Sequence, residues 1–176
     1  TLTGFKWISK VENLIFGYEE ALGYCVDPDF TPDKDGITAA LLIAELAADL
    51  KPMGQDLSDF LAELARDYGH LATGQVSIRV SDLSIISKIM AGLRANPVSI
   101  ILGQECRFED LKEGKNLPPT DGILLNADSL RVIIRPSGTE PKLKCYLQVQ
   151  GESAEAAKED LESLKTWAKG LLQDLS

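Results

Sequence analysis

The stretch GILLNADSLRVIIRPSGTEPKLKCYLQV, residues 122–149, indicates the fold of the part of the chain around it. Two apolar runs flank the turn-forming residues NADS at 126–129, a pattern that predicts a β-hairpin. From 142 to 149 apolar and polar residues alternate, so the two sets should point to opposite faces of a strand. The apolar set is Leu143, Cys145, Leu147 and Val149, and the polar set is Lys142, Lys144, Tyr146 and Gln148. The stretch therefore predicts antiparallel strands with one buried face.

The N-terminal third of the chain is predicted to be irregular at first and then helical. Residues 1–16 are compatible with a strand or a short helix, and the glycines and prolines of 17–36 predict a long loop. Residues 36–50 are apolar nearly all round, which predicts a buried helix that begins near Asp33 or Asp35. Residues 57–68 carry apolar side chains on one stripe, which predicts an amphipathic helix.

The pattern changes near Gly69–Gln75, where we place a boundary between two parts of the chain. The segments predicted beyond it are a strand at 74–80, a helix that Ser81 and Asp82 cap, a short strand at 98–102, a polar loop at 103–121 and a helix at 153–173. Helices together with antiparallel strands predict an α+β domain for this part.

The composition restricts the classes of partner. The formal net charge of −9 argues against broad binding to nucleic acid or to anionic membranes, because both need a basic surface. No apolar run approaches the roughly 18–20 residues of a spanning helix, and no signal peptide opens the chain. The chain starts on TLTGFKWIS without a methionine, which suggests a piece of a longer protein.

The cysteines, the histidine and the aspartates predict no metal site. Three widely spaced cysteines and one histidine, His70, form no zinc or disulfide pattern, and a reducing cytoplasm fits them best. The aspartates between Asp27 and Asp35 fail the EF-hand spacing, because Thr31 and Pro32 occupy its fifth and sixth positions. We interpret His70 as structural.

The segment RPSGTEP, residues 135–141, is the candidate site for an anion. Arg135 follows a strand and precedes a turn in which Gly138 can take a positive φ. Consecutive amides and hydroxyls in such a turn can form a nest for a phosphate, and Lys144 projects from the polar face of the next strand. An ordinary polar turn, with Arg135 paired to Glu140, is the alternative, and the spacing does not decide between the two.

The string RPSGTEPKLKCY closely resembles the C-terminal phosphate-binding loop of the α-D-phosphohexomutases, the phosphoglucomutase and phosphomannomutase family. The resemblance implies that Arg135, Ser137, Gly138 and Thr139 hold the substrate phosphate that is distant from the reacting one. Lys144 stands where several members have a second arginine, which implies a contact to the same phosphate.

Two further loops resemble parts of the sugar site of that family. TGFK at 3–6 looks like its T-G-x-K loop, which implies that Thr3 and Gly4 touch the sugar. FGYEEALGY at 16–24 is similar to its G-E-x-S-G loop, which implies that Glu19 or Glu20 accepts from sugar hydroxyls, with Glu19 preferred. Ala21 or Leu22 replaces the serine of that loop, a departure that leaves one hydroxyl contact without its residue.

A third loop, DKDG at 33–36, resembles the K-D-G that opens a helix in the family. That match implies that Lys34 reaches the substrate phosphate. The alternative is an N-cap cluster with an exposed lysine, and both interpretations stay open.

The resemblance also implies a domain organisation. Residues 1–69 should be the C-terminal part of the sugar-binding domain 3, a mixed α/β domain. Residues 70–176 should be the phosphate-binding domain 4, a TATA-binding-protein-like α+β domain with an antiparallel sheet and packed helices. The phosphorylated catalytic serine and the magnesium loop of the family have no counterpart in the sequence, so we expect no catalytic or metal-binding residue here.

The function implied is that of the substrate-binding part of a cytoplasmic sugar-phosphate mutase, a phosphomannomutase or phosphoglucomutase, that is inactive alone. Its expected partners are a small-molecule sugar phosphate and its own N-terminal domains 1 and 2, with no nucleic acid and no membrane. Magnesium belongs to the full-length enzyme, and a glucose 1,6-bisphosphate-type activator is compatible with the mechanism. The alternatives are a phosphopentomutase of the same family, a stand-alone sugar-phosphate-binding module and a plain α+β interaction domain.

Overall fold

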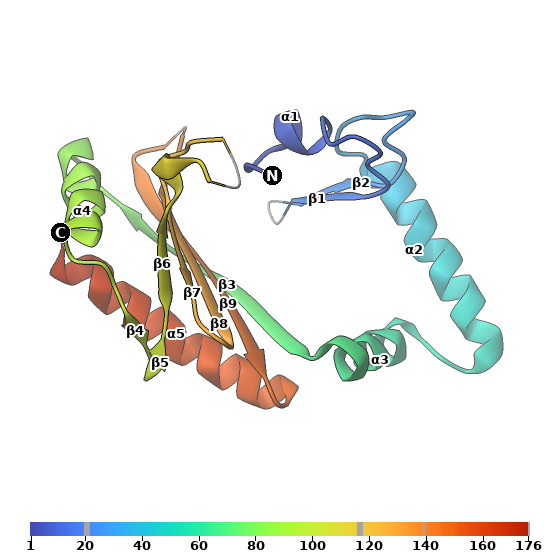
Figure 1. The fold of residues 1–176 in the computed structure, drawn as a ribbon. Coiled ribbons are helices and arrows are strands. Elements are labelled where there is room, and N and C mark those ends of the chain that lie inside the picture. Colours follow the sequence, from blue (N-terminus) through green and yellow to red (C-terminus); the bar gives the residue numbers. More distant parts are fainter. Residues whose placement is uncertain (20–21, 116–117, 139, 176) are drawn as a thin grey trace. The chain divides into compact units, whose positions relative to one another are not determined.

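The computed structural model describes two compact units (Figure 1). They comprise Thr1–Leu64 and Ala65–Ser176. The residues described are 1–19, 22–115, 118–138 and 140–175. Each unit is described by itself below.

The first unit begins with a short helix and a short hairpin. Helix α1 (Phe5–Ile8) confirms the helical alternative for the start of the chain. Strands β1 (Gly17–Glu19) and β2 (Gly23–Cys25) pair antiparallel, so the prediction of a long loop over 17–36 was wrong for 17–19 and 23–25 and holds for 26–35. Phe5, Ile8 and Cys25 form a small core beneath this hairpin.

Helix α2 (Gly36–Leu50) is present as predicted, but its burial is not. The Asp35 carboxylate caps it by accepting from the backbone N–H groups of Ile37 at 2.9 Å and Thr38 at 3.4 Å. Among its residues only Leu50 is buried, and Leu41 is 65% exposed. The prediction of a buried helix was wrong because the described part of this unit offers α2 only a short hairpin, with two three-residue strands, as a packing layer.

A 3₁₀ turn, η1 (Lys51–Met53), leads to helix α3 (Leu57–Tyr68). The predicted C-terminal glycine is confirmed: Gly69 has φ +93° and donates its N–H to the carbonyl of Ala65 at 2.9 Å. The apolar stripe of α3 is formed, but none of its residues is buried in the structure.

The second unit contains a five-stranded antiparallel sheet in the order β3-β9-β8-β7-β6. Its strands are β3 (His70–Arg79), β6 (Arg107–Asp110), β7 (Ile123–Asn126), β8 (Leu130–Pro136) and β9 (Lys142–Gly151). The hairpin predicted for 122–136 is confirmed, and Ala127 closes its turn by donating to the carbonyl of Leu130 at 2.8 Å. The predicted alternation in β9 is also confirmed, since its four apolar residues are all buried.

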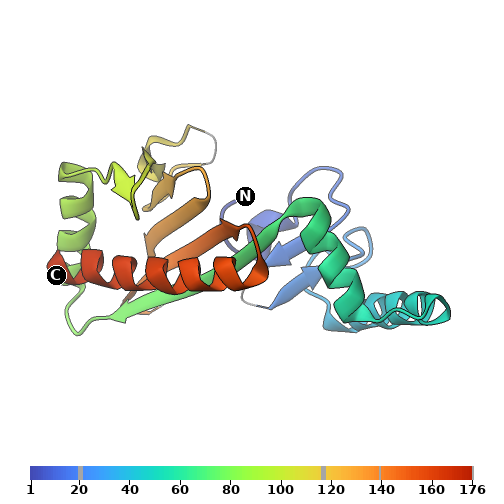
Figure 2. The ribbon, with the colours of Figure 1, turned by 90° about the horizontal axis from the view of Figure 1, so that it is seen from below.

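Helices α4 (Leu83–Ala95) and α5 (Ala154–Asp174) cover one face of this sheet and share its core. Asp82 caps α4 as predicted, by accepting from the N–H of Ser84 at 2.8 Å. Helix α5 runs along β3 and β9 (Figures 1 and 2). The unit therefore has the predicted α+β architecture, with one sheet face buried and the other open.

Two glycines let α5 approach the sheet closely. A Cβ on Gly74 would lie 2.8 Å from the Lys165 side chain, and one on Gly151 would lie 2.5 Å from the backbone nitrogen of Ala157. Cys145 of β9 lies in the same core, where burial raises the pKa of its thiol to about 12. The core is thus tightly packed where α5 crosses β3 and β9.

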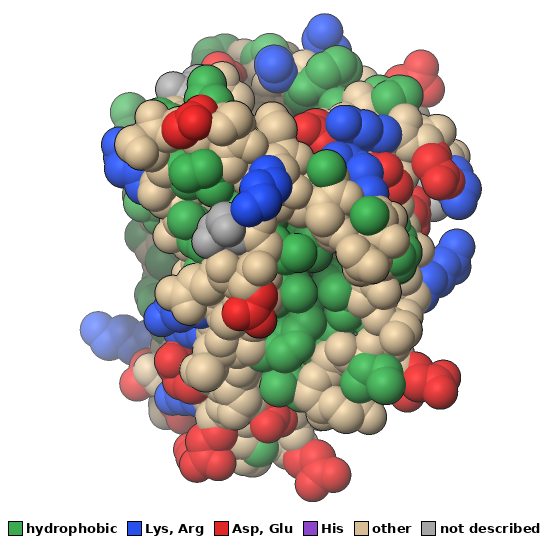
Figure 3. All heavy atoms as spheres, turned by 90° about the vertical axis from the view of Figure 1, so that its left-hand side faces the viewer, with side chains coloured by type: hydrophobic (Ala, Val, Ile, Leu, Met, Phe, Trp, Pro, Cys, Tyr) green, Lys and Arg blue, Asp and Glu red, His purple; other side chains and the backbone are tan. Residues whose placement is uncertain are grey.

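The segment between α4 and β7 contains more strand than the sequence indicated. Strands β4 (Ile100–Ile101) and β5 (Gln104–Glu105) form a small hairpin, and β6 and the 3₁₀ turn η2 (Leu111–Glu113) follow. The prediction of a polar loop over 103–121 was therefore wrong up to Glu113, whereas the described residues from Gly114 to Asp121 form neither helix nor strand. Figure 3 shows apolar side chains among interspersed acidic and basic ones on the face that carries α4 and this hairpin.

Candidate functional site

The open face of the sheet, opposite α4 and α5, carries the predicted anion-binding residues of β8 and β9. Arg135 and Lys144 lie directly opposite each other in the β8–β9 register, and Ser77 of β3 lies opposite Lys144. Like charges placed directly opposite each other across two strands are unfavourable. A bound anion would relieve this repulsion.

Tyr146 lies two residues after Lys144 on the same face of β9, and its side chain contacts the Arg135 guanidinium. The Nη2 group of Arg135 donates to the Tyr146 hydroxyl at 3.0 Å, and the guanidinium carbon lies 5.4 Å from the centre of the tyrosine ring. Sequence reasoning placed Tyr146 on the polar face but gave it no role. The alternation alone could not reveal the contact, because the contact depends on the β8–β9 register.

Arg135 also holds the one buried side-chain nitrogen or oxygen that lacks a hydrogen-bond partner among the described residues. This atom is its Nε. Buried polar atoms without partners are rare in native proteins, and an unpaired donor costs about 1–3 kcal/mol. The arginine is therefore incompletely satisfied in the protein alone.

The alternative pairing of Arg135 with Glu140 is not observed. Glu140 pairs instead with Lys142 at 2.6 Å and with Arg79 at 3.2 Å. The hydrogen bond from Lys142, together with the charges of Lys142, Arg79 and Lys144, lowers the pKa of the Glu140 carboxyl. The nearby carboxylate is thus occupied elsewhere and leaves the Arg135 charge without a described acidic partner.

The turn after Arg135 differs in part from the predicted nest of amides. The N–H of Ser137 donates to the carbonyl of Lys142 at 2.9 Å, so this amide is already used within the protein. Gly138 does not have a positive φ, and a Cβ built on it would meet nothing within 4 Å. Thr139 lies outside the described residues. Among the described residues, the space next to Gly138 is therefore open to a ligand, and Gly138 does not adopt the positive φ that the sequence would allow.

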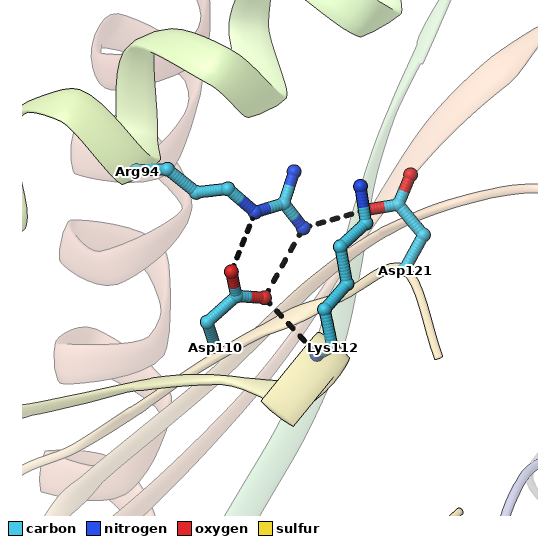
Figure 4. A network of polar contacts seen from close by, with 4 residues as sticks. All are labelled: Arg94, Asp110, Lys112 and Asp121. Atoms are coloured by element: carbon cyan, nitrogen blue, oxygen red, sulfur yellow. Dashed lines mark hydrogen bonds and ion pairs between the residues drawn. The ribbon is translucent and has the colours of Figure 1, made fainter. Parts of the chain in front are cut away.

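A cluster of charged residues joins α4 to the end of β6 and to the segment between β6 and β7 (Figure 4). Arg94 of α4 binds Asp110 through Nε at 2.8 Å and Asp121 through Nη2 at 2.6 Å, and the Lys112 ammonium lies 3.4 Å from Asp121. Gly122, which follows Asp121 in the chain, lies close to Arg135: a Cβ built on Gly122 would lie 3.6 Å from the Cβ of Arg135. Two acidic residues near the site are thus matched by two basic ones.

In the first unit, two of the predicted sugar-site loops meet around Phe5. Gly4, with φ +107°, begins α1 and accepts from the N–H of Trp7 at 2.9 Å. The Lys34 ammonium lies 5.3 Å from the centre of the Phe5 ring, and a Cβ on Gly23 would lie 2.7 Å from the Lys34 side chain.

The predicted sugar-binding glutamates belong to the β1–β2 hairpin. Glu19 is half-buried in β1 and lies opposite Gly23, whereas Glu20 and Ala21 lie outside the described residues. Leu22 has φ +63° and is exposed. Thr3 is exposed. Gly4, Lys34 and the Glu19 hairpin are therefore neighbours within this unit.

The described ranges contain no group of three or more His, Cys, Asp or Glu side chains that could hold a metal ion. Within those ranges no helix is long and apolar enough to cross a membrane.

Comparison with known families identifies the chain. The family model described as "Phosphoglucomutase/phosphomannomutase, alpha/beta/alpha domain III" matches residues 1–68, and that described as "Phosphoglucomutase/phosphomannomutase, C-terminal domain" matches residues 105–164. The chain belongs to the phosphoglucomutase/phosphomannomutase family. The resemblance inferred from RPSGTEPKLKCY is thereby confirmed, and so is the mixed α/β and α+β fold class.

Relatives in the phosphoglucomutase/phosphomannomutase family carry several names. A probable phosphomannomutase of Haemophilus influenzae is 48% identical over 89% of this chain and 32% of its own length. A phosphoglucomutase of Staphylococcus haemolyticus is 33% identical over 91% of this chain and 33% of its own length. A phosphopentomutase of Pongo abelii is 33% identical over 85% of this chain and 29% of its own length. The chain spans about a third of the length of these relatives.

Proposed function

We propose that the chain is the substrate-recognition part of a phosphohexomutase, an isomerase that works by intramolecular phosphoryl transfer. In this proposal Arg135 binds the phosphate of a sugar phosphate that is not being transferred. Lys144, Ser137, Gly138 and Thr139 complete the phosphate site. Positioning and charge stabilisation carry most of the catalysis in phosphoryl transfer, so a fixed cation at the distant phosphate contributes directly.

The observation that carries the proposal is the unpaired, buried Nε of Arg135. A guanidinium presents its five N–H groups in a planar fork that matches the oxygens of a phosphate. One described hydrogen bond, to Tyr146, uses a single N–H of that fork. A phosphate at this position would accept from the Nη groups of the fork, and the buried Nε could donate to it after a small shift of the side chain.

We also propose that the loops of the first unit bind the sugar. Glu19 or Glu20 would accept from two neighbouring hydroxyls, which suits a carboxylate. Thr3 and Gly4 would contact the sugar from the start of α1, and Lys34 would reach a phosphate. The neighbourhood of Gly4, Lys34 and Glu19 within the unit supports this assignment.

The proposal assigns the chemical step to parts of the whole protein outside this chain. The phosphorylated serine and the magnesium ion would belong to domains 1 and 2, and residues 1–69 and 70–176 would belong to domains 3 and 4. The relatives are about three times as long as this chain, and the exposed apolar side chains of α2 offer a surface for the remainder to cover. The three free cysteines accord with a cytoplasmic location.

The experiment is a calorimetric titration of the chain with glucose 1,6-bisphosphate. Arg135→Ala should weaken binding roughly 10- to 100-fold, since a charged hydrogen bond contributes about 1.5–3 kcal/mol. Arg131→Ala is the matched control, because Arg131 lies on the same face of β8 four residues earlier. Equal affinities for wild type and Arg135→Ala would overturn the site assignment.

The preferred substrate is proposed to be a hexose phosphate, because the relative with 48% identity is named a probable phosphomannomutase. A pentose phosphate is the second candidate, since the phosphopentomutase relative is also similar and the family's sugar-loop serine is replaced here by Ala21 or Leu22. Assays of the whole protein on mannose 1-phosphate, glucose 1-phosphate and ribose 1-phosphate separate them. If the whole protein were active on none of the three sugar phosphates, that result would favour the alternative of a stand-alone sugar-phosphate-binding module.

A further inference from the structure

We infer that Tyr146 is the positioning residue for Arg135: its hydroxyl fixes the guanidinium in the phosphate site without neutralising it. The inference rests on the proposed function, in which Arg135 binds the phosphate. It adds a residue that would touch no substrate and would act through the arginine.

The sheet register sets the contact. Arg135 lies opposite Lys144, and Tyr146 is two residues farther along β9 on the same face, opposite Ile133. Diagonal neighbours of this kind are about 7–8 Å apart, within reach of an aromatic ring and a long side chain. The hydrogen bond of 3.0 Å and the ring distance of 5.4 Å show that the two side chains meet.

The chemistry of the partner matters as much as the contact. Two other arginines of this unit are held by carboxylates: Arg94 by Asp110 and Asp121, and Arg79 by Glu140. A carboxylate partner would cancel much of the charge that attracts an anion. A phenol accepts one hydrogen bond, carries no charge at neutral pH and leaves the remaining N–H groups of Arg135 available.

The cross-strand neighbours of Tyr146 do not compete with Arg135 for a hydrogen bond to the Tyr146 hydroxyl. Gln75, opposite Tyr146 on β3, donates its amide N–H to the Ser77 hydroxyl at 2.6 Å. Ile133, on the other side, has no polar group in its side chain. Cation–π contact with the tyrosine ring adds to the hydrogen bond, and together they restrict the rotamers of a flexible side chain.

The test uses the 176-residue chain and two variants of Tyr146. Tyr146→Phe removes only the hydroxyl, and Tyr146→Leu removes the ring as well. We expect the Kd for glucose 1,6-bisphosphate to rise roughly three- to tenfold in the Phe variant and more in the Leu variant. Tyr68→Phe is the matched control, because Tyr68 precedes β3 and lies at the opposite end of the sheet from Ser77 and Lys144.

A second measurement reports on the arginine itself. In the ligand-free protein, the Nε–Hε resonance of Arg135, identified by its loss in Arg135→Lys, should shift in Tyr146→Phe and stay unchanged in Tyr68→Phe. A purely structural role of Tyr146 would lower the stability of the unit without a selective change at this resonance.

The outcomes separate the two proposals. Wild type that fails to bind glucose 1,6-bisphosphate overturns the proposed function, and the resonance then still decides whether Tyr146 orients Arg135. Wild type that binds, with Tyr146→Phe equal to it within twofold and an unshifted resonance, overturns the inference and leaves the proposed function standing.

Discussion

At the scale of one residue, Gly138→Ala should affect ligand binding without affecting the stability of the fold. Its φ is not positive and a Cβ would have open space, so Gly138→Ala should change the free energy of unfolding by less than about 0.5 kcal/mol. The added methyl group would occupy open space in the turn that follows Arg135, where we propose that the phosphate binds. Titration with glucose 1,6-bisphosphate should therefore show weaker binding in a protein of unchanged stability.

Gly103 serves as the control, because its substitution should affect the stability of the fold and not ligand binding. It has φ +82° in the β4–β5 turn, and a Cβ there would also meet nothing within 4 Å. Gly103→Ala should cost about 1–2 kcal/mol of stability, because L-residues are strained at positive φ, and should leave binding unchanged. A Gly138→Ala variant that binds as tightly as wild type would argue against a ligand at this turn.

At the scale of elements, two glycines, one within helix α5 and one at the end of β9 against it, should affect stability in opposite directions when replaced by alanine. Gly170 lies within the helix with nothing within 4 Å of a Cβ, so Gly170→Ala should raise stability by about 0.5–1 kcal/mol. Gly151→Ala would bring a Cβ to 2.5 Å from the Ala157 backbone and should cost about 1–3 kcal/mol. Urea unfolding followed by Trp167 fluorescence in a Trp7→Phe background measures both, and equal effects of the same sign would contradict the packing described.

The Arg94 cluster links α4 to the β6–β7 connection and should make this link sensitive to acid. Hydrogen bonds from Arg94 lower the pKa of Asp110. A carboxyl with a lowered folded-state pKa stabilises the fold above its unfolded pKa of about 3.9, and this stabilisation is lost as the pH falls through the folded value. Asp110→Asn should therefore cost about 1–3 kcal/mol at pH 7, and its difference from wild type should shrink below about pH 4.

Urea unfolding between pH 7 and pH 3 measures this dependence. Asp128→Asn is the control, since it removes the same charge from an exposed turn between β7 and β8. A difference between wild type and Asp110→Asn that stays constant down to pH 3 would show that Arg94 does not stabilise the ionised carboxylate.

Across the whole molecule, burial is unevenly divided between the two units. Only Leu50 of α2 is buried, whereas five residues of α5 are. Amides in weakly packed helices open more readily, so hydrogen exchange should be at least roughly tenfold faster in α2 than in α5. Mass spectrometry of peptides from both helices measures this, and equal protection would contradict the burial pattern.

The sequence predicted those elements whose patterns are local. The alternation in 142–149, the NADS turn and the Asp82 cap are each decided by a few neighbouring residues, and all three were confirmed. Strand β6 was missed because Arg107-Phe108-Glu109-Asp110 has one apolar residue, and β1 and β2 were missed because each has only three residues. The burial of α2 was overestimated because an apolar helix needs a neighbouring layer, which its own sequence does not specify.

For the candidate site, local sequence identified Arg135 but not its surroundings. The hydrogen bond to Tyr146 and the engagement of Glu140 with Arg79 depend on the pairing of β8, β9 and β3. Strand register of this kind is a long-range property of the chain. It therefore becomes visible only when the sheet is assembled.

The burial of the thiols has a practical use in spectroscopy. Cys25 and Cys145 are fully buried, Cys106 is half-buried, and burial raises the pKa of all three. The thiolate is the form that alkylating dyes attack, so the native cysteines should label slowly at neutral pH. A single cysteine engineered at the exposed position of Pro141, in the turn after Arg135, would then accept a fluorophore selectively, and the arrival of a sugar phosphate could be followed by light emission in real time.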